Sequence, residues 1–91
     1  MILEIFMNLD VIRKKINNID LAIIQLIKKR LDLADMAKKS KIKIGLKIID
    51  LKREKEVLKN VNENSKLLDL NEEKIVKLFK IIIQLSRERQ Q

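Results

Sequence analysis

Residues 9–37, LDVIRKKINNIDLAIIQLIKKRLDLADMA, decide the fold of this chain. Aliphatic residues recur along this stretch at alternating steps of three and four, a spacing that lines them up on one side of an α-helix and is typical of a coiled coil. These positions are Leu9, Ile12, Ile16, Ile19, Ile23, Leu26, Leu33 and Ala37. The pattern predicts one helix about 50 Å long at about 1.5 Å per residue. Asn8 or Asp10 can cap its start.

Two shorter helices are predicted after the long one. Gly45, the only glycine, marks the loop that leaves the first helix. Asp50 suits the N-cap of a second helix, which carries its apolar residues before the polar run NENSK at 62–66. The segment from Asp69 to Glu72 resembles a capping box that opens a third helix. The apolar stripe of that helix reads Ile75, Leu78, Phe79, Ile82 and Ile83.

The composition agrees with an all-α fold. Of 91 residues, 46% are hydrophobic and 37% are charged, with one glycine and no proline, which favours long uninterrupted helices over a turn-rich sheet. A chain of this length forms one small domain with little core to spare, so a partner chain is one way to complete it. The apolar start, MILEIFM, carries Glu4 and is too short for a bilayer span or a usual signal sequence. We therefore expect a soluble cytoplasmic protein with no membrane partner, a poorly ordered N-terminal extension at 1–7 and a single domain at 8–91.

The residue types exclude several kinds of chemistry. The chain has no Cys and no His, which removes thiol and imidazole catalysis and the commonest transition-metal ligands, and no metal site is expected. An enzyme made from this chain must work chiefly by positioning and electrostatics. The net charge of +8 suggests an anionic partner. Basic runs at 13–15 and 28–30 resemble nucleic-acid contacts, but the aromatic residues that stack on bases are nearly missing, so nucleic acid is disfavoured.

Polar residues interrupt the apolar stripe of every predicted helix. They are Arg30 on the first helix, Glu54 on the second, and Ser86 and Gln90 on the third. A charge removed from water costs several kcal/mol unless it is paired, so the interruptions need a cause. One interpretation is a buried ion pair between Arg30 and Glu54, with the polar end of the third helix merely closing the core. The other is a polar ligand pocket formed by facing helices.

Helix geometry decides which cations can share such a pocket. Arg30 and Lys41 are eleven residues apart, about three turns, so both point to one side of the first helix. Arg13 lies seventeen residues before Arg30, which is about 25 Å along the axis and about 100° around it. One helix cannot bring Arg13 and Arg30 to one small site, so a partner chain would have to supply one of them.

The order and intervals of eight polar residues resemble the active-site pattern of the all-helical chorismate mutases, the AroQ class. The eight are Arg13, Arg30, Lys41, Asp50, Arg53, Glu54, Ser86 and Gln90. The resemblance covers residues 9–90 without insertion or deletion. It implies an intertwined homodimer in which each subunit has one long and two shorter helices, and an isomerase that converts chorismate to prephenate in the biosynthesis of phenylalanine and tyrosine. That conversion is an intramolecular Claisen rearrangement, which needs no nucleophile, proton transfer or cofactor.

The resemblance also implies a role for each residue. Arg30, together with Arg13 of the partner chain, would bind the two substrate carboxylates, with Ser86 assisting. Lys41 and Gln90 would donate hydrogen bonds to the ether oxygen, which makes them, with Arg30, the expected catalytic residues. Glu54 and the backbone at Asp50 would hold the ring hydroxyl, and Arg53 would orient these groups or balance their charge.

Two alternatives stay open. An isochorismate-pyruvate lyase resembles the same fold and uses a closely similar pocket. A non-enzymatic helical dimer would bind anions or nucleic acid through its basic faces, although a plain coiled coil would be expected to have an aliphatic residue at Arg30.

Overall fold

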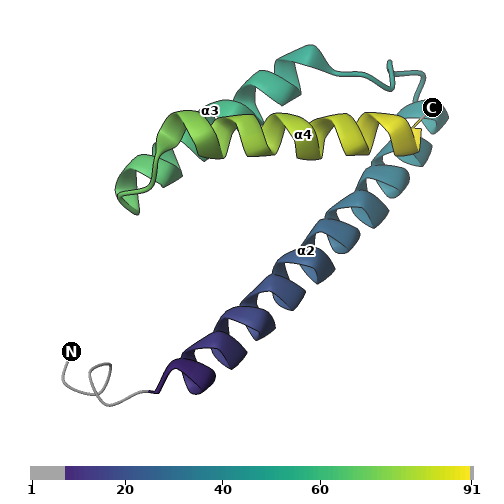
Figure 1. Cartoon of the computed structure of the whole chain (residues 1–91). Coiled ribbons are helices and arrows are strands. Elements are labelled where there is room, and N and C mark those ends of the chain that lie inside the picture. Colours follow the sequence, from purple (N-terminus) through teal and green to yellow (C-terminus); the bar gives the residue numbers. More distant parts are fainter. Residues whose placement is uncertain (1–7, 91) are drawn as a thin grey trace.

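Three α-helices make up the described part of the chain. The computed structural model describes the backbone of residues 8–90 and the side chains of residues 8–89. The helices are α2 (Leu9–Lys43), α3 (Leu51–Leu67) and α4 (Glu72–Gln90) (Figure 1). No strand occurs within these residues, so the prediction of an all-α fold with one long and two shorter helices is confirmed. The expected extension, residues 1–7, lies outside the described residues.

The start and end of α2 follow from local hydrogen bonds. Asn8 is the N-cap, and its side-chain oxygen accepts a hydrogen bond of 2.9 Å from the backbone N–H of Val11. At the other end Gly45 has φ of +75°, a left-handed conformation that glycine adopts at low cost. The N–H groups of Gly45 and Leu46 bond back to the carbonyls of Ile42 and Lys41, which is the Schellman pattern of helix termination. The predicted cap at Asn8 and loop at Gly45 are confirmed.

α3 begins where the sequence predicts but continues further. The Asp50 carboxylate caps it by accepting from the backbone N–H of Arg53 at 3.0 Å. The helix then runs through the polar stretch 62–66 to Leu67. This stretch stays helical because it contains no glycine or proline, and the buried Ser65 hydroxyl is satisfied by donating to the carbonyl of Val61 at 2.7 Å.

The predicted capping box at the start of α4 is wrong. Asn71 caps this helix, since its side-chain oxygen accepts from the backbone N–H of Lys74 at 3.0 Å. Asp69 instead has φ of 55° and belongs to the end of α3. The N–H groups of Asp69 and Leu70 bond to the carbonyls of Lys66 and Ser65, a second Schellman ending. The motif failed because Asp, a common helix cap, also adopts the left-handed conformation more readily than most residues do.

α4 is the central element of the fold. It packs against α3 along one side and against α2 along the other, while α2 and α3 do not pack on each other within the described residues. The most deeply buried apolar side chains, Ile82 and Ile83, both belong to α4 and are 8% exposed. Figure 1 shows α3 and α4 side by side, with the C-terminal half of α2 meeting the end of α4 and its N-terminal half extending away from both.

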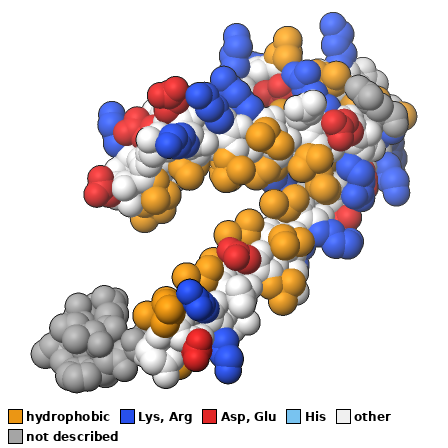
Figure 2. All heavy atoms as spheres, in the orientation of Figure 1, with side chains coloured by type: hydrophobic (Ala, Val, Ile, Leu, Met, Phe, Trp, Pro, Cys, Tyr) orange, Lys and Arg blue, Asp and Glu red, His pale blue; other side chains and the backbone are white. Residues whose placement is uncertain are grey.

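The N-terminal half of α2 has an apolar face that is exposed and is not covered by the other described helices. Most of the predicted aliphatic positions of α2 are exposed, for example Ile19 at 59% and Leu26 at 62%. Figure 2 shows hydrophobic side chains along this part of α2 and along the facing edge of the α3–α4 pair. We call the exposed residues Leu9, Ile16, Ile19, Ile23 and Leu26 the bare face of α2. None of the described helices combines the length and apolarity needed to cross a bilayer.

We expect Ile82→Ala to lower the free energy of unfolding by about 2–5 kcal/mol, because it removes a buried aliphatic side chain from the small core. Urea denaturation followed by circular dichroism measures the change. Leu67→Ala is the control, since Leu67 is 82% exposed and its loss should change stability by no more than about 0.5 kcal/mol. Equal losses in the two variants would show that Ile82 is not part of the core.

Candidate active site

A pocket of about 290 Å³ lies where the three helices meet. It is bounded by the C-terminal half of α2, the loop after it, the first turns of α3 and the last turns of α4. Its apolar lining consists of Leu33, Ala34, Ala37, Ile48, Val57 and Ile83. Its polar lining consists of Arg30, Lys41, Asp50, Arg53, Glu54, Ser86 and Arg87. Four cationic side chains and two carboxylates leave the pocket with a charge of about plus two, which favours a small anion.

The structure brings six of the eight predicted site residues together around this pocket, all except Arg13 and Gln90. Arg13 lies in the second turn of α2 and is exposed, on the part of that helix that extends away from α4. Gln90 is the last residue of α4, and its side chain lies outside the described residues. The expectation that one chain cannot bring Arg13 to the site of its own Arg30 agrees with this arrangement.

Arg30 is held against α4 by a serine. Its Nη1 donates to the Ser86 hydroxyl at 2.8 Å, and that hydroxyl donates in turn to the carbonyl of Ile82 at 3.2 Å. Ser86 is 9% exposed, so its bond to Arg30 lies largely out of water. The predicted nearness of Arg30 and Ser86 is therefore observed, and the guanidinium keeps further N–H groups for a ligand.

The alternative ion pair between Arg30 and Glu54 is wrong. Glu54 pairs with Arg87, whose Nε and Nη2 donate to the two carboxylate oxygens at 2.8 and 2.5 Å. This two-pronged geometry suits a guanidinium and a carboxylate. The hydrogen bond from Arg87 to Glu54 raises the pKa of Arg87 above its ordinary value.

Sequence reasoning missed Arg87. It lies four residues after Ile83, so it continues the apolar stripe of α4 by one turn and reaches the same pocket. The prediction extends this stripe only along the row of Ile82, to Ser86 and Gln90. Applying the same spacing to Ile83 would have identified Arg87 as a third polar residue on that face.

Lys41 and Arg53 have partners outside the predicted set. The Lys41 ammonium donates to the carbonyl of Ile48 at 2.7 Å, which ties the loop after α2 to the pocket wall. The Arg53 guanidinium lies 3.4 Å from the Glu56 carboxylate on the exposed side of α3. Lys41 keeps two further N–H donors for a ligand, whereas Arg53 is directed at a neighbour on its own helix.

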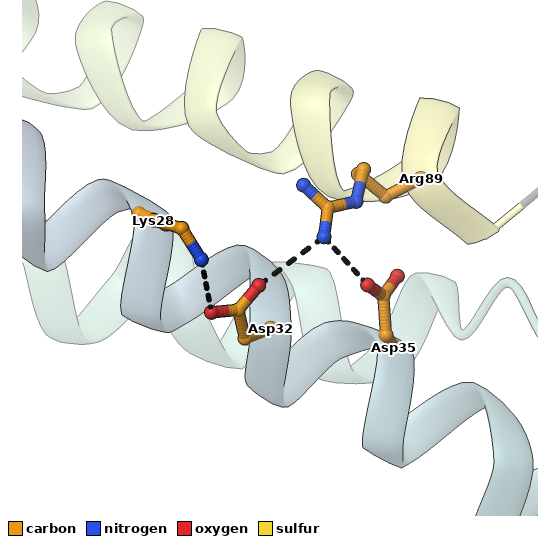
Figure 3. Close-up of polar contacts among 4 residues, drawn as sticks. All are labelled: Lys28, Asp32, Asp35 and Arg89. Atoms are coloured by element: carbon orange, nitrogen blue, oxygen red, sulfur yellow. Dashed lines mark hydrogen bonds and ion pairs between the residues drawn. The ribbon is translucent and has the colours of Figure 1, made fainter.

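The last turn of α4 is also bonded to α2 by an ion-pair network. Arg89 Nη2 lies 3.2 Å from an Asp32 oxygen and 2.7 Å from an Asp35 oxygen, and Lys28 donates to Asp32 at 2.9 Å (Figure 3). The hydrogen bond from Lys28, aided by Arg89, lowers the pKa of Asp32. The bond to Asp35 raises the pKa of Arg89. Ser86 and Arg89 together hold the end of α4 against α2.

We expect Asp32→Asn to lower Tm slightly at about pH 6, and we expect this difference to shrink as the pH falls below 3.8. Folding lowers the pKa of Asp32 below its ordinary 3.8, so its stabilising effect is complete above that value and is lost as the pH falls through the folded-state pKa. Thermal melts of both proteins across this range measure the difference. Asp20→Asn, an exposed change on the same helix, is the control; a difference for Asp32→Asn that grows on acidification would contradict the assignment.

A family model described as chorismate mutase type II matches residues 12–91. The chain belongs to the chorismate mutase type II family. The match covers all three helices from the first turn of α2 onward, and it confirms the resemblance seen in the sequence.

Two curated relatives have chorismate mutase in their names. The chain is 42% identical over 74 residues to the bifunctional chorismate mutase/prephenate dehydratase of Buchnera aphidicola subsp. Schizaphis graminum, an alignment that covers 81% of this chain and 19% of the relative. It is 37% identical over 76 residues to the protein of the same name from Buchnera aphidicola subsp. Acyrthosiphon pisum, covering 84% of this chain and 20% of the relative. The chain thus spans about a fifth of the length of these chorismate mutase relatives.

Proposed function

We propose that this chain is a chorismate mutase, which converts chorismate to prephenate by an intramolecular Claisen rearrangement, a step toward phenylalanine and tyrosine. The observation that carries the proposal is the pocket that gathers six predicted site residues from three helices in a chain of this family. A cytoplasmic location remains a prediction.

The pocket suits the needs of this reaction. The substrate carries two carboxylates, and the pocket has a charge of about plus two with apolar walls around it. The rearrangement breaks a C–O bond and forms a C–C bond within one molecule, so the protein has to hold the compact reactive conformer and stabilise charge on the ether oxygen. The side chains of this pocket are suited to both tasks without a nucleophile.

The roles follow the chemistry of each group. Arg30, whose guanidinium is fixed by Ser86, binds one carboxylate with two parallel hydrogen bonds. Lys41, and Gln90 from the last turn of α4, donate to the ether oxygen as negative charge develops there. Glu54 accepts a hydrogen bond from the ring hydroxyl, beside the backbone at Asp50, and Arg53 adds positive charge at the rim.

The proposal includes a homodimer in which Arg13 of the partner chain binds the second carboxylate. Two observations support it. Arg13 lies on the part of α2 that reaches away from the pocket of its own chain, and the bare face of α2 leaves a large apolar surface without a cover. In a homodimer, α2 and the α3–α4 edge of the second chain would cover that surface, because helices with coiled-coil spacing pack their apolar faces against one another.

A spectrophotometric assay of chorismate disappearance, with prephenate identified as the product, tests the function. Isochorismate is assayed in parallel, and release of pyruvate from it without conversion of chorismate would instead favour the lyase. A salt-sensitive gel shift with nucleic acid and no turnover of either substrate would favour a non-enzymatic binding protein.

A further inference from the structure

The Glu54 carboxylate depends on a single side chain for its orientation. Among the described residues, both side-chain hydrogen bonds to it come from Arg87, which donates to one oxygen through Nε and to the other through Nη2. Arg53, the residue expected to orient Glu54 or balance its charge, is directed at Glu56 instead. Arg87, and not Arg53, is thus the cation bonded to Glu54 in this structure.

The pair also forms a wall. A second hollow is lined by Glu54 and Arg87 together with Leu58, Lys80, Ile83 and Gln84. Glu54, Ile83 and Arg87 line both hollows, so the ion pair stands between the pocket and this outer hollow. The side chains of Glu54 and Arg87 are 23% and 35% exposed, so the pair is partly shielded from water.

The bond geometry leaves Glu54 able to serve a ligand. An ionised carboxylate offers about four lone-pair positions, and the Arg87 fork occupies two of them. The remaining positions accept a hydroxyl proton without displacing Arg87. Holding both oxygens also fixes the plane of the carboxylate, which sets the direction from which a hydroxyl can approach.

We propose that Arg87 is a positioning residue that fixes the Glu54 carboxylate for the substrate's ring hydroxyl and closes the pocket on that side. This inference rests on the proposed function. Arg87 acts through Glu54 and need not touch the reacting atoms.

A double-mutant cycle tests the proposal. We expect Arg87→Met to lower kcat/KM for chorismate roughly tenfold in the otherwise unchanged chain, and by less than about twofold when Glu54→Gln is already present. Arg87→Lys keeps the charge but loses the fork, so it should resemble Arg87→Met more than the unchanged chain. Lys77→Met is the matched control, because it removes an ion pair with Glu73 on the same helix, outside both hollows.

The outcomes separate the two claims. Two results would overturn the positioning role and leave the mutase assignment intact. One is an equal loss of kcat/KM from Arg87→Met in the unchanged chain and in the Glu54→Gln variant. The other is full activity in Arg87→Lys. If the protein without substitutions does not convert chorismate, the proposed function is overturned, and the role of Arg87 with it. Tm values identify any variant that is merely unfolded. If Arg87→Met does not fold, Arg87→Lys is compared in both backgrounds.

Discussion

Replacing Lys41 with alanine is expected to lower kcat at least about a hundredfold while the chain remains helical. The ammonium lines the pocket and donates at 2.7 Å to the carbonyl of Ile48, which leaves two donors for the ether oxygen of the substrate. Losing one preorganised donor to developing charge typically costs about 3 kcal/mol of transition-state stabilisation. Steady-state kinetics with chorismate measures the effect on kcat and KM separately.

The control for this variant is Lys39→Ala, which removes an exposed lysine two residues away that does not line the pocket. Its kcat should stay within about twofold of the unchanged chain. Because Lys41 also ties down the loop after α2, thermal melts of both variants are compared. Near-normal turnover in a folded Lys41→Ala protein would remove Lys41 from the catalytic set.

Mixing two inactive variants is expected to restore activity. Arg13→Ala and Arg30→Ala should each lose at least about a hundredfold in kcat/KM, since each removes a carboxylate-binding guanidinium. If every site takes Arg30 from one chain and Arg13 from the other, a mixed dimer contains one intact site and one site lacking both arginines. Full subunit exchange at equal amounts would then give about a quarter of the unchanged activity.

The control is a second mixture, in which both variants lack a residue that the same chain supplies to its own pocket. Arg30 and Lys41 line the pocket of the same chain, so Arg30→Ala mixed with Lys41→Ala leaves every site with one defect and should regain nothing. Equal recovery in both mixtures, or no recovery in the first despite proven exchange, would contradict a site shared between two chains. Size-exclusion chromatography after mixing confirms that dimers are present.

The helices could be read from the sequence because their signals are local. Asn8, Gly45 and Asp50 act through hydrogen bonds to residues within a few positions of themselves, and the structure has all three where the sequence predicts. Asp69 was misread because the same side chain suits an N-cap and a left-handed turn, and in the structure it takes the left-handed turn that ends α3.

The site was partly readable because helix periodicity fixes which residues share a face. Extending each stripe identified Arg30, Glu54 and Ser86, and these residues do line one pocket. Periodicity does not say which polar side chains pair across helices, so the bond from Glu54 to Arg87 could not be predicted. That pairing depends on how far α3 and α4 are rotated about their axes.

The central position of α4 has a consequence for how this pocket can change. Arg30 on α2 and Glu54 on α3 lie on two walls of the pocket. Because α2 and α3 each pack on α4 and not on each other, the distance between these walls depends on the side chains of α4 that separate the two helices. Ile82 is buried on α4 and does not line the pocket, so we expect a residue of different size there to change how α4 packs and, through that packing, the width of the gap. Selectivity for ligands of different size would then depend in part on a core position outside the pocket lining.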